Sequence, residues 1–220
     1  MRPFLNAMSE HDLSARPNTT PEIQRVLLNS QIGQGAFSYI YAYDEGRVMK
    51  FSQHIENLTL LAELSEKSPH YPVVSAIYEN QAQDYENANY HAAIIEKLID
   101  HRPDWVDNII VTAFRARVRI LTGVDSSTRL LEMSNGILTG KLRIPDNCRE
   151  SFSEALALLG AACKEKGLVA DFRHDLNFMT RADGTVVIAD PAHHERFFVD
   201  YLKKISLEDL NFRPRHKLPR

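Results

Sequence analysis

The sequence predicts an α+β fold in two parts, with a β-rich part over residues 23–98 and a mostly helical part over residues 99–212. Residues 26–52 alternate apolar and polar side chains around glycines, a pattern typical of three short antiparallel strands. Residues 151–166 place apolar side chains at helical spacing and form the clearest helical segment. Residues 177–189 favour a second hairpin inside the helical part.

Composition is that of an ordinary globular protein and argues against two classes of function. Of the 220 residues, 44% are hydrophobic and 25% are charged. The net charge of -3 provides no overall positive field that would attract nucleic acid. No apolar stretch approaches the length of a membrane span. The two cysteines, Cys148 and Cys163, are too few for a disulfide or metal framework, which favours a reducing compartment.

The two ends of the chain differ from the rest in composition. Residues 1–22 are rich in Ser, Thr, Asn and Pro and predict a flexible leader. Such a leader resembles the export signals of bacterial secreted effectors, although any disordered terminus has a similar composition. Residues 213–220 are locally basic, which is typical of a solvated tail or of a contact for an acidic partner. The expected location is therefore the cytoplasm, or the host cytosol after secretion by bacteria.

The β-rich part contains one predicted helix. Residues 52–67 carry apolar side chains at helical spacing up to the break at Pro69. Two further strands are expected over residues 73–78 and 91–98, with a polar loop over residues 79–89 between them.

The helical part is less regular in sequence. Residues 105–121 suggest a helix, and residues 130–144 are ambiguous between a helix and a loop with short strands. Ser151 and Glu154 have the spacing of a capping box, which predicts a helix start at Ser151. Gly167 is expected to end that helix as its C-cap.

The first candidate site is a glycine-rich hairpin. Ile32, Gly33, Gln34 and Gly35 precede an aromatic residue and a return strand. Two glycines here would let the backbone approach a polyphosphate and turn its N–H groups toward it. An ordinary tight hairpin has the same residues, so this motif is weak alone.

Lys50 follows two apolar residues on the next predicted strand. A stiff strand is the setting that a phosphate-binding lysine requires. Glu56 and Glu63 lie seven residues apart and share a face of the following helix, so either could pair with Lys50, and Glu63 is favoured. A surface lysine and two solvated glutamates are the alternative.

The strongest candidate site lies at the second hairpin. Asn177 and Asp190 are thirteen residues apart, and the hairpin between them would bring both side chains to its open end. Carboxylate and amide oxygens there are suitable ligands for Mg²⁺. Asp171 and Asp175 precede the hairpin, where an acidic residue could accept a hydroxyl proton.

The order and spacing of these residues resemble those of the protein-kinase-like superfamily, with the closest similarity to minimal kinases of bacterial secreted effectors and phages. The resemblance spans residues 27–191 and implies a two-lobed protein-kinase-like fold with a reduced C-terminal lobe. It implies a monomer that transfers the γ-phosphate of ATP to Ser or Thr of a target protein, including a host protein if the chain is a secreted effector, with ATP and Mg²⁺ as cofactors. The implied catalytic residues are Asp175, Asp171 and Lys50, the metal ligands are Asn177 and Asp190, and the ATP contacts are Ile32, Gly33, Gln34, Gly35, Lys50, Glu63, Glu56, Glu96 and Leu98.

The chain also departs from that family. The pattern His-Arg-Asp-x-x-x-x-Asn is not met, because the residue five before Asn177 is Phe172. The identity of the base, Asp175 or Asp171, therefore stays open. A pseudokinase that binds ATP without turnover is one alternative, and a small-molecule phosphotransferase or AMP transferase is another. Pro191 follows Asp190 in place of Phe-Gly, so the usual activation switch is not expected.

Overall fold

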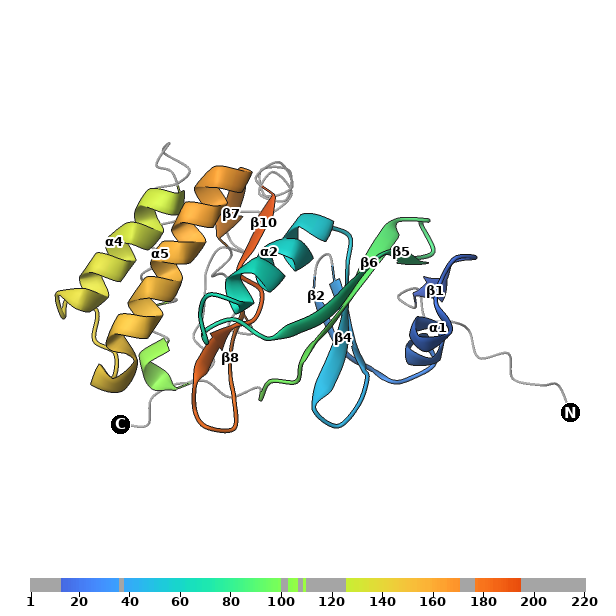
Figure 1. Cartoon of the computed structure of the whole chain (residues 1–220), viewed down its shortest axis with the longest axis horizontal. Coiled ribbons are helices and arrows are strands. Elements are labelled where there is room, and N and C mark those ends of the chain that lie inside the picture. The colour runs from blue at the N-terminus through green and yellow to red at the C-terminus, as the bar shows by residue number, and fades with distance from the viewer. Residues whose placement is uncertain are drawn as a thin grey trace, which may run out of the picture.

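The computed structural model describes residues 13–35, 38–99, 103–106, 109, 126–170 and 177–194, and it has a mixed α+β architecture. A six-stranded antiparallel sheet lies at one end and two long helices lie at the other, with two small sheets between them (Figure 1). The strands are β1 (Ser14–Ala15), β2 (Gln31–Gly35), β3 (Ser38–Ala42), β4 (Arg47–Ser52), β5 (Val74–Gln83), β6 (Asn89–Glu96), β7 (Leu168–Ala170), β8 (Phe178–Thr180), β9 (Val186–Ile188) and β10 (Ala192–His194). The helices are α1 (Pro21–Leu27), α2 (Ile55–Ser65), α4 (Ser126–Leu138), the 3-10 turn η1 (Asp146–Cys148) and α5 (Arg149–Lys166).

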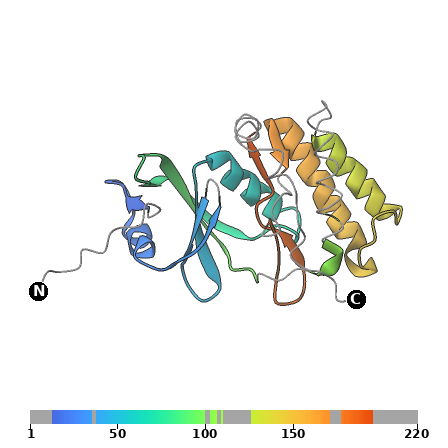
Figure 2. The ribbon, with the colours of Figure 1, turned by 180° about the vertical axis from the view of Figure 1, so that it is seen from behind.

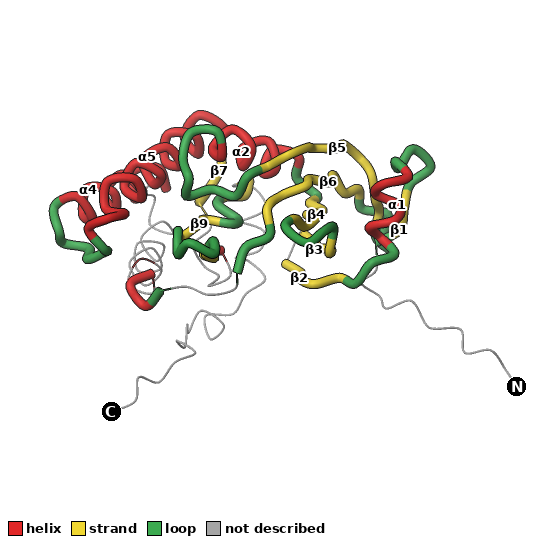
Figure 3. Tube along the Cα trace, turned by 60° about the horizontal axis from the view of Figure 1, so that its bottom comes forward, coloured by secondary structure: helices red, strands yellow, loops and turns green. Residues whose placement is uncertain are grey.

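The large sheet has the strand order β1-β5-β6-β4-β3-β2, so β4 and β6 lie in its centre. Three consecutive strands, β2, β3 and β4, form the half that carries the glycines and Lys50, as the alternating pattern predicts. Figure 3 shows the strands between α1 at one end and the helices α2, α4 and α5 toward the other.

Both faces of this sheet are covered. Side chains alternate along a strand, so β4 presents Val48 to one face and Met49 to the other. The core on the Val48 face continues through α2 into α5. The core on the Met49 face is closed by Ile23 and Val26 of α1. The burial of β4 on both faces follows from this arrangement.

The N-terminal segment corrects one prediction. Residues 13–22 are folded and do not belong to a flexible leader. Leu13 is buried, β1 pairs with the end of β5, and the Thr19 hydroxyl donates to the carbonyl of Gln81. The Thr20 side chain accepts from the Ile23 N–H and caps α1, whose first residue is Pro21. The remaining leader residues, 1–12, and the basic tail over residues 213–220 lie outside the described residues.

The connection between β5 and β6 is shorter than the polar composition of residues 79–89 predicts. β5 continues to Gln83, with irregular pairing between Tyr78 and Ala82. Within this irregular stretch Asn80 has a positive φ of 52°. An irregular ladder accommodates polar residues that a regular strand pattern would exclude, so the loop prediction was wrong there.

The clearest helix of the helical part, α5, begins two residues earlier than the sequence predicts. α5 starts at Arg149, so Ser151 lies inside its first turn and the predicted capping box does not form. The Ser151 hydroxyl instead donates to the Cys148 carbonyl. Gly167 ends the helix with a φ of 64°, which confirms the predicted C-cap. The ambiguous residues 130–144 include most of α4, and most of the helix expected over residues 105–121 lies outside the described residues.

Between the sheet and the long helices lies the predicted hairpin. β8 and β9 pair antiparallel, with Phe178 opposite Ile188. The same hairpin is seen from behind in Figure 2, between α2 and α5. A second small sheet, β7 with β10, was not predicted, because strands of three residues show no periodicity. No helix within the described part of the chain is long and apolar enough to cross a membrane.

Candidate functional site

Lys50 lies on the central strand β4 and projects from the face of the sheet that packs toward the helical part. Its neighbours across the ladder are Ile40 on β3 and Ala93 on β6. The Lys50 side chain is only 6% exposed, and its Nζ lies 2.9 Å from Oδ1 of Asp190. A buried ammonium requires such a counter-charge, because burial without one is costly. Two residues 140 positions apart are thereby brought into direct contact.

The hairpin brings Asn177 to Ala189, the residue before Asp190. The Ala189 N–H donates to the Asn177 carbonyl at 2.8 Å, immediately beyond the last paired residues of β8 and β9. Asn177 is buried, whereas the Asp190 side chain is 41% exposed. One residue of the pair is therefore held in the protein interior and the other faces an open side.

The donor set of this pair fits a magnesium ion only in part. Asp190 offers a half-exposed carboxylate, whereas Asn177, which would offer an amide oxygen, is buried. Among the described residues no group of three or more His, Cys, Asp or Glu side chains could hold a metal. Magnesium sites with one or two protein ligands are common where substrate phosphates and water supply the rest. These residues fit Mg²⁺ bound together with a nucleotide.

The glycine hairpin is aligned with Lys50. Gly33 on β2 lies opposite Ile40 on β3, and Ile40 lies opposite Lys50 on β4. The three residues form one row across the sheet. A Cβ on Gly33 would meet only the Ile40 side chain, at 3.4 Å, so the fold itself tolerates a side chain there. The neighbouring Ile32 is exposed, and residues 36–37 lie outside the described residues.

The helix glutamates do not pair with Lys50, contrary to the prediction. Glu63 lies 2.9 Å from Lys166 at the end of α5. Glu56 lies in the first turn of α2, and its charge acts on His91, whose pKa burial lowers and the carboxylate raises. Heptad spacing places both glutamates on one face of the helix but does not determine which face points toward Lys50. Asp190 takes the place expected of a glutamate.

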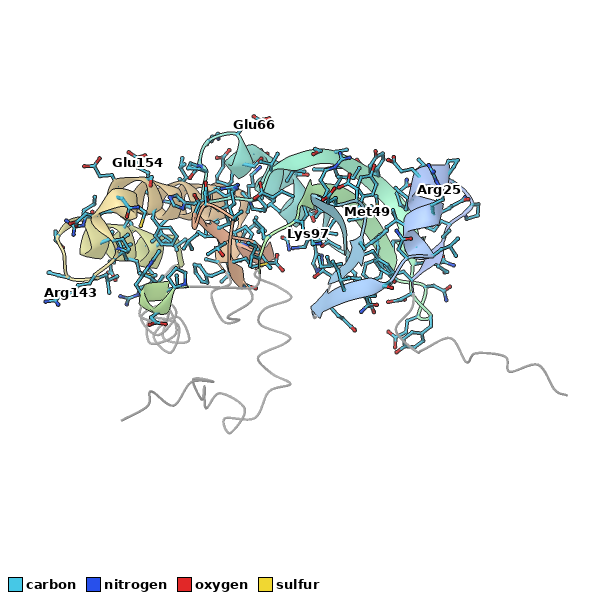
Figure 4. The ribbon with its side chains drawn as sticks, turned by 90° about the horizontal axis from the view of Figure 1, so that it is seen from below. Arg25, Met49, Glu66, Lys97, Arg143 and Glu154 are labelled. Carbon is cyan, nitrogen blue, oxygen red and sulfur yellow. The ribbon has the colours of Figure 1, made fainter. Side chains whose placement is uncertain are left out.

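The two ATP contacts predicted at the end of β6 and just beyond it, Glu96 and Leu98, have different environments. The carboxylate of Glu96 is fully engaged by Arg181, with 2.7 Å from Nε to Oε1 and 3.0 Å from Nη2 to Oε2. Leu98 is half-buried and follows Lys97, whose N–H donates to the Gly46 carbonyl. Lys97 lies where the sheet meets the hairpin (Figure 4). A ligand near this segment would meet its backbone and the Leu98 side chain more readily than the Glu96 carboxylate.

Two residues at the junction of the parts were missed by the sequence reasoning. Arg181 precedes a turn, and its sequence neighbours do not indicate its ion pair with Glu96. His70 is buried, with Nδ1 2.7 Å from the Val186 carbonyl and Nε2 2.9 Å from the Ser151 hydroxyl. Burial and the nearby Arg181 charge lower the pKa of His70, although the bond to Val186 opposes them. Both residues connect the hairpin to other elements, which a local pattern does not show.

The two candidate bases, Asp171 and Asp175, lie outside the described residues. Both ends of their segment are nevertheless placed. It begins after Ala170, which pairs with Ala192 two positions beyond Asp190, and it ends at Asn177. The segment therefore starts and finishes beside the candidate metal residues.

A scan against protein-family models found no match to this chain, and no similar sequence was found among curated proteins.

Proposed function

We propose that the chain is a protein-kinase-like phosphotransferase that binds ATP and Mg²⁺ between the glycine hairpin and the end of β9. The observation that carries this proposal is the contact between Lys50 and Asp190 at 2.9 Å. A cation on a central strand next to a carboxylate at a hairpin end is suited to a phosphate chain with its metal.

The arrangement around this contact supports a two-lobed architecture of the kinase type with a reduced C-terminal lobe. The glycine strand lies two strands from Lys50, and a helix, α2, follows the Lys50 strand. β5 and β6 complete that sheet, and the segment after β6 leads to the helical part. The pair β7–β10 frames the segment that contains both candidate bases.

Each residue has a definite task in this proposal. Backbone N–H groups of the glycine hairpin cover the phosphates, and Lys50 orients and partly neutralises them. Asn177 and Asp190 would hold Mg²⁺, which supplies positive charge to the β- and γ-phosphate oxygens when it is bound. Asp171 or Asp175 orients the acceptor hydroxyl.

The reaction is transfer of the γ-phosphoryl group to a Ser or Thr hydroxyl of a protein. A bond forms between the hydroxyl oxygen and the γ-phosphorus, and the bond to the β–γ bridging oxygen breaks. ADP leaves, and the hydroxyl proton passes to the carboxylate base. The protein substrate, including a host protein, is part of this proposal and rests on the family resemblance alone.

Incubation of the protein with a host lysate and either γ-labelled or α-labelled ATP tests the function. Label from the γ position on protein, lost in Lys50→Ala and Asp190→Ala, is the expected result. Label from the α position would indicate AMP transfer, and γ-label on a small molecule would indicate a small-molecule kinase. ATP binding without any transfer would indicate a pseudokinase. Absence of a thermal shift at millimolar Mg-ATP would refute the kinase-like function, because a ligand of the native state raises its stability.

A further inference from the structure

The hairpin β8–β9 is attached to the large sheet at both of its ends. At the open end, Asp190 contacts Lys50 of β4. At the turn end, Arg181 contacts Glu96 at the end of β6. Next to this pair, Ile99 and Thr180 exchange two backbone hydrogen bonds of 2.8 and 3.1 Å. The two attachments are at opposite ends of one short hairpin.

The turn-end attachment is built around the guanidinium of Arg181. Nε and Nη2 contact the two carboxylate oxygens of Glu96 in a bidentate arrangement. Nη2 also donates to the Tyr71 carbonyl at 2.9 Å, and Nη1 donates to the Pro69 carbonyl. Oε2 of Glu96 additionally accepts from the Val73 N–H at 2.9 Å. One side chain thus joins the hairpin, the α2–β5 connection and the end of β6.

This pair is suited to setting a position because both side chains are largely enclosed. Arg181 is 22% exposed and Glu96 is 18% exposed. A planar guanidinium that is bonded on two sides has few alternative orientations. An exposed ion pair of two long side chains would not restrict the elements in the same way.

Nucleotide binding would change the open-end attachment. If Lys50 turns to phosphate oxygens and Asp190 turns to a metal ion, their direct contact at 2.9 Å is replaced by contacts through the ligand. The hairpin would then keep its place relative to the sheet by its turn-end attachment.

We propose that the Arg181–Glu96 pair is a positioning device that fixes the metal-binding end of the hairpin relative to Lys50 in the nucleotide complex. This inference rests on the proposed function. Arg181 and the Glu96 carboxylate contact neither nucleotide nor metal, and they act through Asn177 and Asp190. The pair therefore governs how much Mg²⁺ strengthens ATP binding.

The decisive measurement is made by calorimetry. It is the dissociation constant of ATP in EDTA divided by the dissociation constant of ATP in excess Mg²⁺, a ratio that rises as Mg²⁺ strengthens binding. Arg181→Lys keeps the charge but loses the bidentate contact, and Glu96→Gln keeps the shape but loses the charge. We expect each to lower this ratio by about tenfold, because small misplacements of a positioned group have effects of that order or larger. For Arg181→Lys the dissociation constant in EDTA should stay within about twofold, since Lys50 and the glycine hairpin are unchanged.

A matched control is a further ion pair between the two parts of the chain. Lys166 of α5 contacts Glu63 of α2 at 2.9 Å, away from the hairpin. Lys166→Gln breaks that pair and should leave the ratio unchanged. The double variant Arg181→Lys/Glu96→Gln should lose no more than either single variant, because residues that act as one unit are not additive.

The outcomes separate this inference from the function on which it rests. If the wild type does not bind ATP, the proposed function fails and the inference falls with it. If the wild type shows a metal-dependent ratio and both single variants keep it, the positioning role alone is refuted. Equal weakening in EDTA and in Mg²⁺ would indicate a merely structural pair and would also refute it. If Glu96→Gln is unfolded at the assay temperature, the ratio for Arg181→Lys decides.

Discussion

Lys50 and Asp190 differ in burial, and this difference determines which of them the fold needs more. Removing the Asp190 carboxylate leaves a 6% exposed ammonium without its partner, whereas removing Lys50 leaves a carboxylate that is 41% exposed and can be hydrated. We expect Asp190→Ala to lower the free energy of unfolding by about 2 kcal/mol and Lys50→Met to lower it by clearly less. Urea denaturation without nucleotide measures both.

Lys166→Met provides the comparison, because its ion pair with Glu63 is more exposed and should contribute about 0–1 kcal/mol. A larger loss in Lys50→Met than in Asp190→Ala would contradict the assignment of Asp190 as the counter-ion of a buried lysine.

His70 makes the stability depend on pH. Burial keeps its folded-state pKa below the ordinary value of 6.5, so the unfolded chain takes up this proton first as the pH falls. Its contribution is therefore fully present above pH 6.5 and is lost as the pH decreases toward the lower folded-state pKa. His70→Gln should flatten the fall in the free energy of unfolding below that pH, as measured by urea titrations at several pH values.

His91→Gln serves as the control for this effect. Burial also lowers the pKa of His91, but the charges of Glu79 and Glu56 oppose the shift. His91→Gln should therefore change the pH dependence of the free energy of unfolding less than His70→Gln does. An unchanged slope in His70→Gln would show that other groups cause the acid sensitivity.

At the scale of elements, the N-terminal segment is part of the fold. Deletion of residues 1–20 would remove Leu13, Thr19 and the Thr20 cap of α1, so the core on the Met49 face would lose Leu13. A truncated buried leucine alone costs about 2–5 kcal/mol, so we expect the deletion to lower the melting temperature strongly. Thermal denaturation of the deleted and full chains tests this.

A smaller change isolates the cap from the rest of the segment. Thr20→Ala removes only the side-chain acceptor for the Ile23 N–H and should cost about 1 kcal/mol. A deletion that melts at the temperature of the full chain would show that the segment is dispensable, as its composition alone suggests.

The sequence predicts elements well where one side-chain period dominates. The hairpin between Asn177 and Asp190 and the end of α5 at Gly167 follow from local rules. The folded state of residues 13–22 does not, because Ser, Thr and Pro serve equally in flexible chains and in helix caps.

Candidate site residues divide in the same way. Lys50 and Asp190 were each singled out by local pattern, but their direct contact was not predicted, because it joins residues 140 positions apart. Glu63 pairs with Lys166 rather than with Lys50, the predicted partner. This choice depends on how α2 is rotated against α5, and the residue spacing within α2 does not determine that rotation.

For the whole molecule, the short distance between Asp190 and the next strand bears on regulation. Only residues 189–191 separate β9 from β10, and Pro191 is buried and fixes its own φ. Pro191 also restricts Asp190 to extended conformations. We expect a phosphotransferase activity that is unchanged by prior phosphatase treatment, because in the described residues up to 194 Asp190 leads directly into β10 rather than into a segment that a phosphate would order.

A generic protein substrate and radiolabelled ATP suffice for this assay, with the phosphatase removed before ATP is added. Loss of activity after dephosphorylation would refute the expectation. Activity that appears only when host lysate is added would instead favour completion of the site by a partner.

Because both faces of the large sheet are covered, its central strands should become exposed only when the whole molecule unfolds. β4 and β6 lie between the core closed by α1 and the core that continues into α5. Their backbone amides reach solvent only when both cores separate, so hydrogen exchange at these strands should report global unfolding rather than local fluctuation. We therefore expect the sheet and the helical part to unfold in one cooperative event, and we expect residues 13–98 expressed alone to expose the apolar side of α2.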